Sequence, residues 1–308
     1  MQPLPGDTRR LQVLAALALP PESATPALLV ELLLEALHQA VLPHLEATVT
    51  AWHHSSTRTG DDLEGRGVRR SGPPRTDLTA AIAALQRSVV GEPLLGRHGD
   101  PRHNLLEGIV LTGQRPDREL HPETFWNDEV VAYPDLREAT LALSVPQDLL
   151  REHDASSVAS GLAAWIQHAA REHGALTGYV TLDEHVTAWN HQSAWEIAVG
   201  SSPYDRDLTR TLYGYGWGTL LRPEHLAAFG GVRWLRSLLT VLPPGGTITE
   251  DPDGSVWLQL SPDIRTTTWQ DIATLRGLLL PALPAGQHTI EQYFSPEPGT
   301  WVVTPYRI

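Results

Sequence analysis

Hydrophobic and polar positions along the chain alternate between strand-like and helix-like periods, with prolines at the changes. Residues 11–19 form a continuous apolar run that ends at two prolines, which predicts a buried strand. Thr25 and Pro26 then mark a helix start, and apolar residues recur every three or four positions along the run that follows. The positions expected to face inward are Leu29, Leu32, Leu33, Ala36, Leu37 and Ala40. Residues 45–52 alternate like a strand and complete a strand–helix–strand unit.

The same order of elements returns later in the chain. Residues 139–145 predict a strand, residues 156–172 a helix, and residues 178–182 a second strand. The inward positions of this helix are Val158, Leu162, Trp165, Ile166 and Ala169. We therefore expect an α+β fold of two comparable strand–helix–strand halves, residues 1–135 and 136–308, with mixed or antiparallel sheets covered by helices. A true duplication and a chance likeness between two such units are both open.

The region between these units has weaker periodicity. Residues 57–75 are rich in Gly, Arg, Asp and Pro, which predicts an exposed loop. Residues 77–89 have a helical pattern, and residues 104–111 have a strand pattern. Residues 121–134 begin as a loop around two aromatic residues.

The last third of the chain begins with residues 213–218, in which aromatic residues alternate with glycines. A short amphipathic helix follows, kinked at two consecutive glycines, and a turn-rich loop leads to a strand at residues 255–260. The helix stripe consists of Leu226, Phe229, Val232, Leu235 and Leu239. Residues 269–280 predict a helix that starts at Thr267 or Thr268, and residues 301–303 predict an edge strand.

Composition excludes several classes of function. The 308 residues include no cysteine, so disulfides, thiolate metal sites and a cysteine nucleophile are excluded. All 23 basic residues are arginine, which excludes a Schiff-base lysine. The net charge of −13 argues against nucleic-acid binding and suits a basic partner.

The N-terminal sequence loosely imitates a signal peptide, because Arg9 and Arg10 precede a short apolar run. That run ends in prolines without a small-residue cleavage site, so a first strand is the favoured interpretation. No apolar stretch approaches the ~18 residues of a membrane span. We therefore expect a cytoplasmic protein that does not associate with membranes.

Histidine and carboxylate residues come closest to a cluster at Asp183, Glu184, His185 and His191. No HExxH helix occurs, and a solvated strand end explains these residues better than a metal site. The remaining candidates, expected to lie in loops, are His53, His54, His98 and His103. The sequence also contains neither a Gly-x-Ser-x-Gly elbow nor a phosphate-binding glycine loop. Because none of these motifs occurs, we predict no catalytic residue, no metal site and no cofactor.

Two features are candidates for binding. The aromatic residues of the glycine-alternating run form a possible platform, although such glycines more often allow close approach of rings or backbone. These residues are Tyr213, Tyr215 and Trp217. The second candidate is the acidic loop of Glu250, Asp251 and Asp253, which is either a polar hairpin turn or a charged surface for a basic partner.

The aromatic–glycine–Trp segment, the Gly-Gly helix and the strand that ends in a Gln-x-Ser-Pro stretch form a combined pattern. The matching positions are Gly216, Trp217, Leu220, Leu221, Pro223, His225, Leu226, Gly230, Gly231, Leu235, Gln259 and Pro262. This pattern resembles the type VI secretion immunity proteins, over roughly residues 136–282. The resemblance implies an α+β immunity protein that binds and blocks a cognate toxin.

Two functional hypotheses follow. The first is a non-enzymatic immunity protein that neutralises a cognate, basic toxin by direct association, with an exposed acidic and aromatic surface. The second is a small hydrolase or transferase in which Asp183, Glu184 and His185 act beside the Tyr213–Trp217 platform. The second hypothesis requires these side chains to converge in one pocket.

Overall fold

The computed structural model describes residues 10–45, 48–58, 68–71, 104–114, 129–135, 139–146, 150, 155–185, 207–237 and 244–283. Its strands are β1 (Arg10–Ala18), β2 (Thr48–Arg58), β3 (Val68–Ser71), β4 (Asn104–Gln114), β5 (Glu129–Asp135), β6 (Thr140–Pro146), β7 (Thr177–His185), β8 (Gly218–Leu221), β9 (Thr247–Glu250) and β10 (Val256–Gln259). Its helices are α1 (Pro26–Ala36), α3 (Ala155–His173), α5 (Pro223–Ala228), α6 (Val232–Ser237) and α7 (Trp269–Leu279). Shorter helical turns are Leu37–Val41, Leu42–His44, Ile264–Thr266 and Leu280–Ala282.

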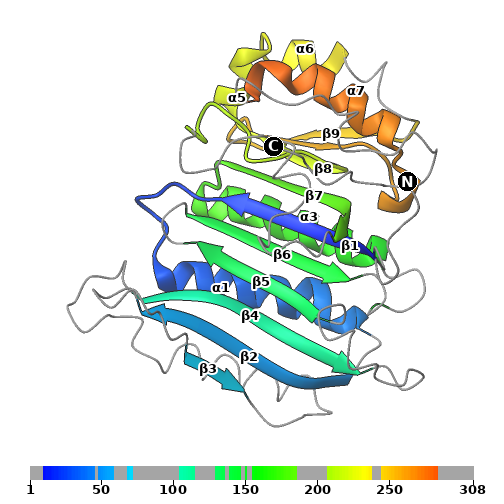
Figure 1. The fold of residues 1–308 in the computed structure, drawn as a ribbon. Coiled ribbons are helices and arrows are strands. Elements are labelled where there is room, and N and C mark those ends of the chain that lie inside the picture. The colour runs from blue at the N-terminus through cyan, green and yellow to red at the C-terminus, as the bar shows by residue number, and fades with distance from the viewer. Residues whose placement is uncertain are drawn as a thin grey trace, which may run out of the picture.

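All these strands belong to one sheet, in the order β3-β2-β4-β5-β6-β1-β7-β8-β10-β9 (Figure 1). Every pair of neighbours is antiparallel. Helices cover the sheet, so the predicted α+β class with antiparallel pairing is confirmed. The two predicted halves are not separate in this sheet, because β1 of the first half lies between β6 and β7 of the second. A division into two halves at residue 135 stays a prediction.

Strand β1 lies at the centre of the molecule. Its described side chains are all buried, on both faces of the sheet, as expected for a continuous apolar run. Thr25 caps α1 as predicted, and its side-chain oxygen accepts a hydrogen bond from the Leu28 amide at 3.2 Å. The inward positions predicted for α1 and α3 are all buried.

Helices α1 and α3 lie side by side on one face of the sheet (Figure 1). A Cβ placed on Gly178 of β7 would lie 2.7 Å from Ile166 of α3, so Gly178 faces this layer. Leu220 of β8 pairs with Gly178, and Trp257 of β10 pairs with Leu220, so both lie on the same face. Val256 is next to Trp257 in β10, so its side chain faces the opposite side of the sheet. Helices α5, α6 and α7 lie on that side, beside β8, β10 and β9 (Figure 1).

The structure changes one predicted element and confirms others. The exposed loop expected at residues 57–75 is wrong in part, because β2 continues to Arg58 and residues 68–71 form β3. Residues 68–71 form a strand because they pair with β2. The local amino-acid composition does not predict this pairing. Residues 77–89, 121–128 and 301–303 lie outside the described part of the chain.

Candidate functional site

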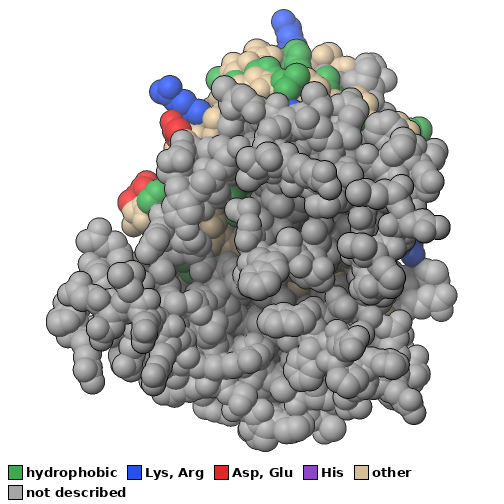
Figure 2. All heavy atoms as spheres, in the orientation of Figure 1, with side chains coloured by type: hydrophobic (Ala, Val, Ile, Leu, Met, Phe, Trp, Pro, Cys, Tyr) green, Lys and Arg blue, Asp and Glu red, His purple; other side chains and the backbone are tan. Residues whose placement is uncertain are grey.

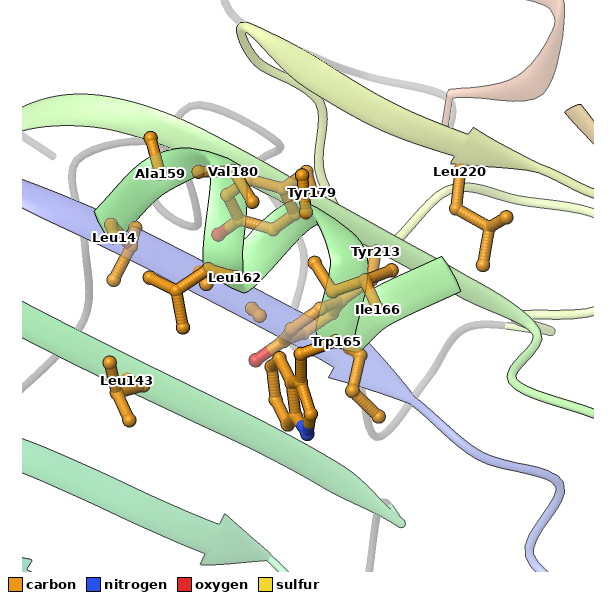
Figure 3. Close-up of a cluster of buried hydrophobic side chains, with 14 of the residues drawn as sticks. Leu14, Leu143, Ala159, Leu162, Trp165, Ile166, Tyr179, Val180, Tyr213 and Leu220 are labelled. Atoms are coloured by element: carbon orange, nitrogen blue, oxygen red, sulfur yellow. The ribbon is translucent and has the colours of Figure 1, made fainter. Parts of the chain in front are cut away.

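The segment 213–218 is a packed cover over one strand. Tyr213, Tyr215 and Trp217 are 5%, 1% and 1% exposed, and the Tyr213 and Tyr179 rings lie 6.1 Å apart. Figure 3 shows Tyr179 and Tyr213 within the buried cluster that also contains α3 side chains. Since Tyr179 alternates with Gly178, this cover lies on the face of β7 opposite α3.

The glycines of this segment are required by close contacts. A Cβ on Gly214 would lie 2.3 Å from the Tyr179 ring, and one on Gly218 would lie 2.2 Å from the Trp257 ring. Real Cβ atoms essentially never approach another heavy atom this closely. The close-approach interpretation of the alternating glycines is therefore confirmed. The expectation of an exposed aromatic platform is wrong, because the three rings are buried in the core.

The Gln-x-Ser-Pro stretch forms a buried hydrogen-bond network around Trp217. The indole Nε1 donates to the Ser261 carbonyl at 2.8 Å, and the Ser261 hydroxyl lies 2.9 Å from the Thr267 hydroxyl. The Gln259 side chain donates to the same Ser261 carbonyl at 2.9 Å. Every polar group named here has a partner inside the protein, so these residues of the immunity-like pattern have structural roles.

Asp263 joins this network to α3, because its carboxylate accepts a hydrogen bond from Ser156 at the start of that helix. Hydrogen bonds from Arg265 and, next, from Ser156 hold the pKa of Asp263 well below its usual range, although partial burial opposes them. The carboxylate is therefore ionised at neutral pH and tied to two elements. It is not a general acid in this arrangement.

His225 is the buried histidine of the pattern. Its ring is 0% exposed; Nδ1 accepts from the Arg222 amide at 3.1 Å, and Nε2 lies 3.2 Å from the Leu208 carbonyl oxygen. One neutral tautomer satisfies both contacts, with Nε2 as the donor. Burial lowers the pKa of His225, and the hydrogen bond to Leu208 opposes this shift. His225 thus holds the start of α5 against the preceding segment.

Each acidic residue of the hairpin loop between β9 and β10 is paired with an arginine of a different element. Glu250 lies 2.6 Å from Arg236 of α6, Asp251 lies 3.5 Å from Arg171 of α3, and Asp253 pairs with Arg222 before α5. Burial raises the pKa of Asp253, but hydrogen bonds from Ser255 and from Arg222 outweigh it, and the net shift is downward. Glu250 and Asp253 are exposed, as expected of a hairpin turn, whereas the Asp251 side chain is mostly buried, and all three carboxylates are paired within the chain.

The outer surface of α1 and α3 has acidic groups that are not compensated in this way. Gly161 of α3 lies against Ala40, and His168 lies 3.7 Å from Glu35, so the two helices run side by side in opposite directions. Glu31 lies one turn before Glu35, and Glu172 lies one turn after His168, which extends the same row. We call this row the α1–α3 seam: Glu31, Glu35, Gln39, His168 and Glu172.

Within the described part of the chain, Glu31 and Glu172 are exposed and have no ion-pair partner. Gln39 donates a hydrogen bond to Glu35 at 3.2 Å, so the middle of the seam is held in place. Sequence reasoning concentrated on the inward stripe of these helices and missed their outward row. The four-residue spacing of Glu31 and Glu35 was the signal that could have identified it.

Of the residues in the hydrolase or transferase hypothesis, the structure describes the side chains of the Tyr213–Trp217 segment only. Asp183, Glu184 and His185 form the end of β7, opposite Gln12 to Arg10 of β1, but their side chains lie outside what the structure describes. His191, His98 and His103 also lie outside the described ranges. The loop expected at His53 and His54 is wrong, because both belong to β2. No group of three or more potential metal ligands occurs among the described residues.

The comparisons with known proteins do not identify a family. No protein-family model matches the chain, and no curated protein matches it. The Pseudomonas aeruginosa T6SS protein PA0821 is a structural neighbour at 16% identity and a TM-score of 0.46, covering 89% of this chain and 76% of that chain. A likeness at this score carries no argument about function. Separately, none of the helices among the described residues is long and apolar enough to cross a membrane.

Proposed function

We propose that this chain is an immunity-type protein that binds a cognate, basic toxin of a type VI secretion system and neutralises it by direct association. The α1–α3 seam is the surface through which it makes the electrostatic contact. This proposal depends on one observation above all: among the described residues, the exposed Glu31 and Glu172 of the seam have no arginine partner, whereas the hairpin acids are paired. Basic groups on a partner would therefore find uncompensated charge on the seam.

The resemblance to immunity proteins supports the same class of function. Three of its matching residues, Trp217, His225 and Gln259, make hydrogen bonds within the protein. A pattern of structural residues is what a binding scaffold requires, because such a scaffold needs a rigid surface and no reactive group. The net charge of −13 adds a long-range attraction to a basic protein.

The test is to measure binding to the protein encoded by the neighbouring gene, by surface plasmon resonance at low and physiological ionic strength. Wild type, Glu31→Gln, Glu172→Gln and the double variant are compared, with Glu224→Gln as control, since Glu224 is exposed on α5 and off the seam. We expect the double variant to slow association about tenfold, with a smaller loss at higher salt.

Two results would count against the proposal in different ways. Failure of the neighbouring product to bind would remove the immunity function. Binding that weakens equally in the double variant and in Glu224→Gln would leave an acidic binding protein but remove the seam as its contact surface.

A further inference from the structure

Strand β9 forms one edge of the sheet, because it pairs with β10 alone. The Asp251 amide donates to the Ser255 carbonyl at 2.9 Å, which makes these two residues a hydrogen-bonded pair of the hairpin. Such pairs alternate along an antiparallel ladder, so Thr249 and Thr247 also direct their backbone groups toward β10. The N–H and C=O groups of Ile248 and Glu250 therefore point away from the sheet.

This edge is open to solvent. Thr247, Thr249 and Glu250 are exposed, and Ile248 is half-buried against the core. Among the described residues, no backbone hydrogen bond to Ile248 or Glu250 exists outside the ladder. The strand contains no proline and no bulge, which are devices that proteins use to block such edges. Only its shortness limits pairing with another strand.

The edge is also held rigid and locally neutral. The three ion pairs of the hairpin acids tie β9 and its turn to α3, α5 and α6, which reduces the entropy that a partner strand would have to overcome. Because Glu250, Asp251 and Asp253 are already paired, a basic partner gains little attraction at this edge. A second copy of the chain, in turn, meets little of the repulsion that a net charge of −13 would otherwise cause.

We propose that β9 pairs with β9 of a second copy, antiparallel, across a two-fold axis at Thr249. In this register Ile248 faces Glu250 of the second copy, so each outward N–H meets an outward C=O. Thr249 faces its own equivalent, and threonine pairs are favourable at such positions. The two Glu250 side chains are not opposite each other, because each faces Ile248 of the other copy. The two sheets become continuous, and the contact is isologous.

The interface is small. A strand of four residues buries far less than the ~1,000 Å² typical of stable interfaces. The dimer is therefore weak and depends on concentration. It is independent of toxin binding, because the α1–α3 seam lies on other elements.

The experiment is sedimentation velocity of the purified chain from about 10 μM to 1 mM, with variants at the axis. Thr249→Lys brings two like charges together and is expected to weaken association at least about threefold, whereas the control Thr249→Ser preserves it. A mixture of Thr249→Lys and Thr249→Asp is expected to regain association, because position 249 meets itself only in this arrangement.

A second pair of variants tests the backbone contact. Glu250→Pro removes an outward N–H without removing a hydrogen bond to β10, and Glu250→Ala breaks the same ion pair while keeping that N–H. We expect association to fall about tenfold in the proline variant relative to the alanine variant, and circular dichroism verifies that both are folded. A wild-type chain that is monomeric throughout the range, or variants that all associate equally, would overturn the proposal.

Discussion

The hairpin loop between β9 and β10 and the α1–α3 seam have similar acidic composition but different surroundings. Glu250, Asp251 and Asp253 each meet an arginine from another element. Glu31 and Glu172 meet none within the described residues. The two regions therefore differ in the position of the arginines and not in acidic composition, and this difference is the basis of the proposed contact surface.

The same contrast separates two kinds of region. In the part of the molecule around residues 213–263, Trp217 and Ser261 make internal hydrogen bonds, and Gly214 and Gly218 lie close to neighbouring rings. Figure 2 shows hydrophobic side chains, with arginine projecting beyond them, at the top of the molecule, where α6 and α7 lie in Figure 1. The two ends of the seam differ from this region, since the carboxylates of Glu31 and Glu172 face water. Changes in the first region should alter stability, and changes in the seam should alter binding.

The largest expected effect is that of Gly218→Ala. Its Cβ would lie 2.2 Å from the Trp257 ring, so the buried indole must move and the free energy of unfolding should fall by about 2–3 kcal/mol. The matched control is Gly277→Ala on α7, where no heavy atom lies within 4 Å and alanine should add up to about 1 kcal/mol. Urea unfolding monitored by tryptophan fluorescence measures both. Equal stability of the two variants would show that residues 213–218 are not tightly packed.

The next effect is a pH dependence from His225. Burial lowers the pKa of His225 below the ordinary histidine value of about 6.5, so the unfolded state binds more protons as the pH falls below that value. The free energy of unfolding should therefore decrease on acidification, by up to about 1.4 kcal/mol per pH unit, until the folded-state pKa is reached.

The variant His225→Gln isolates this contribution, because glutamine does not titrate. Between pH 7.5 and 5, its free energy of unfolding should change less than that of wild type. Parallel curves for the two proteins would mean that protonation of His225 is not coupled to unfolding. The amide of glutamine can still accept and donate at this position, which helps the variant to fold.

The smallest expected effect on stability is that of the seam variants. Glu31→Gln and Glu172→Gln should change the free energy of unfolding by no more than about 0.5 kcal/mol, because both carboxylates are exposed and have no ion-pair partner among the residues that the structure describes. Thermal unfolding measures this change, while toxin binding should respond in the same proteins. A large loss of stability would show that these carboxylates have a structural role.

Hydrophobic periodicity was sufficient to predict β1, α1, β6, α3 and β7, because each has a long apolar run or a clear stripe. It could not predict β3, a four-residue strand whose formation depends on pairing with β2. The site was harder still. The burial of Tyr215 and the pairing of Asp251 with Arg171 both depend on residues that are distant in sequence. The local sequence does not indicate which distant residues will be in contact. The alternation of glycines with aromatic residues in residues 213–218 predicted close approach of rings or backbone, but the sequence analysis did not identify the exposed carboxylates of α1 and α3.

The position of β1 has a consequence for biosynthesis. This strand is synthesised before both of its neighbours in the sheet, which are far from it in sequence: Gln12 pairs with Pro146, and Arg10 pairs with His185. Until β6 has been translated, the apolar β1 segment has no partner strand on either side, and until β7 has been translated it has a partner on one side only, so it is exposed to wrong association. Contacts so distant in sequence also slow folding. A chaperone that shields the β1 segment during synthesis should therefore increase the yield of native protein.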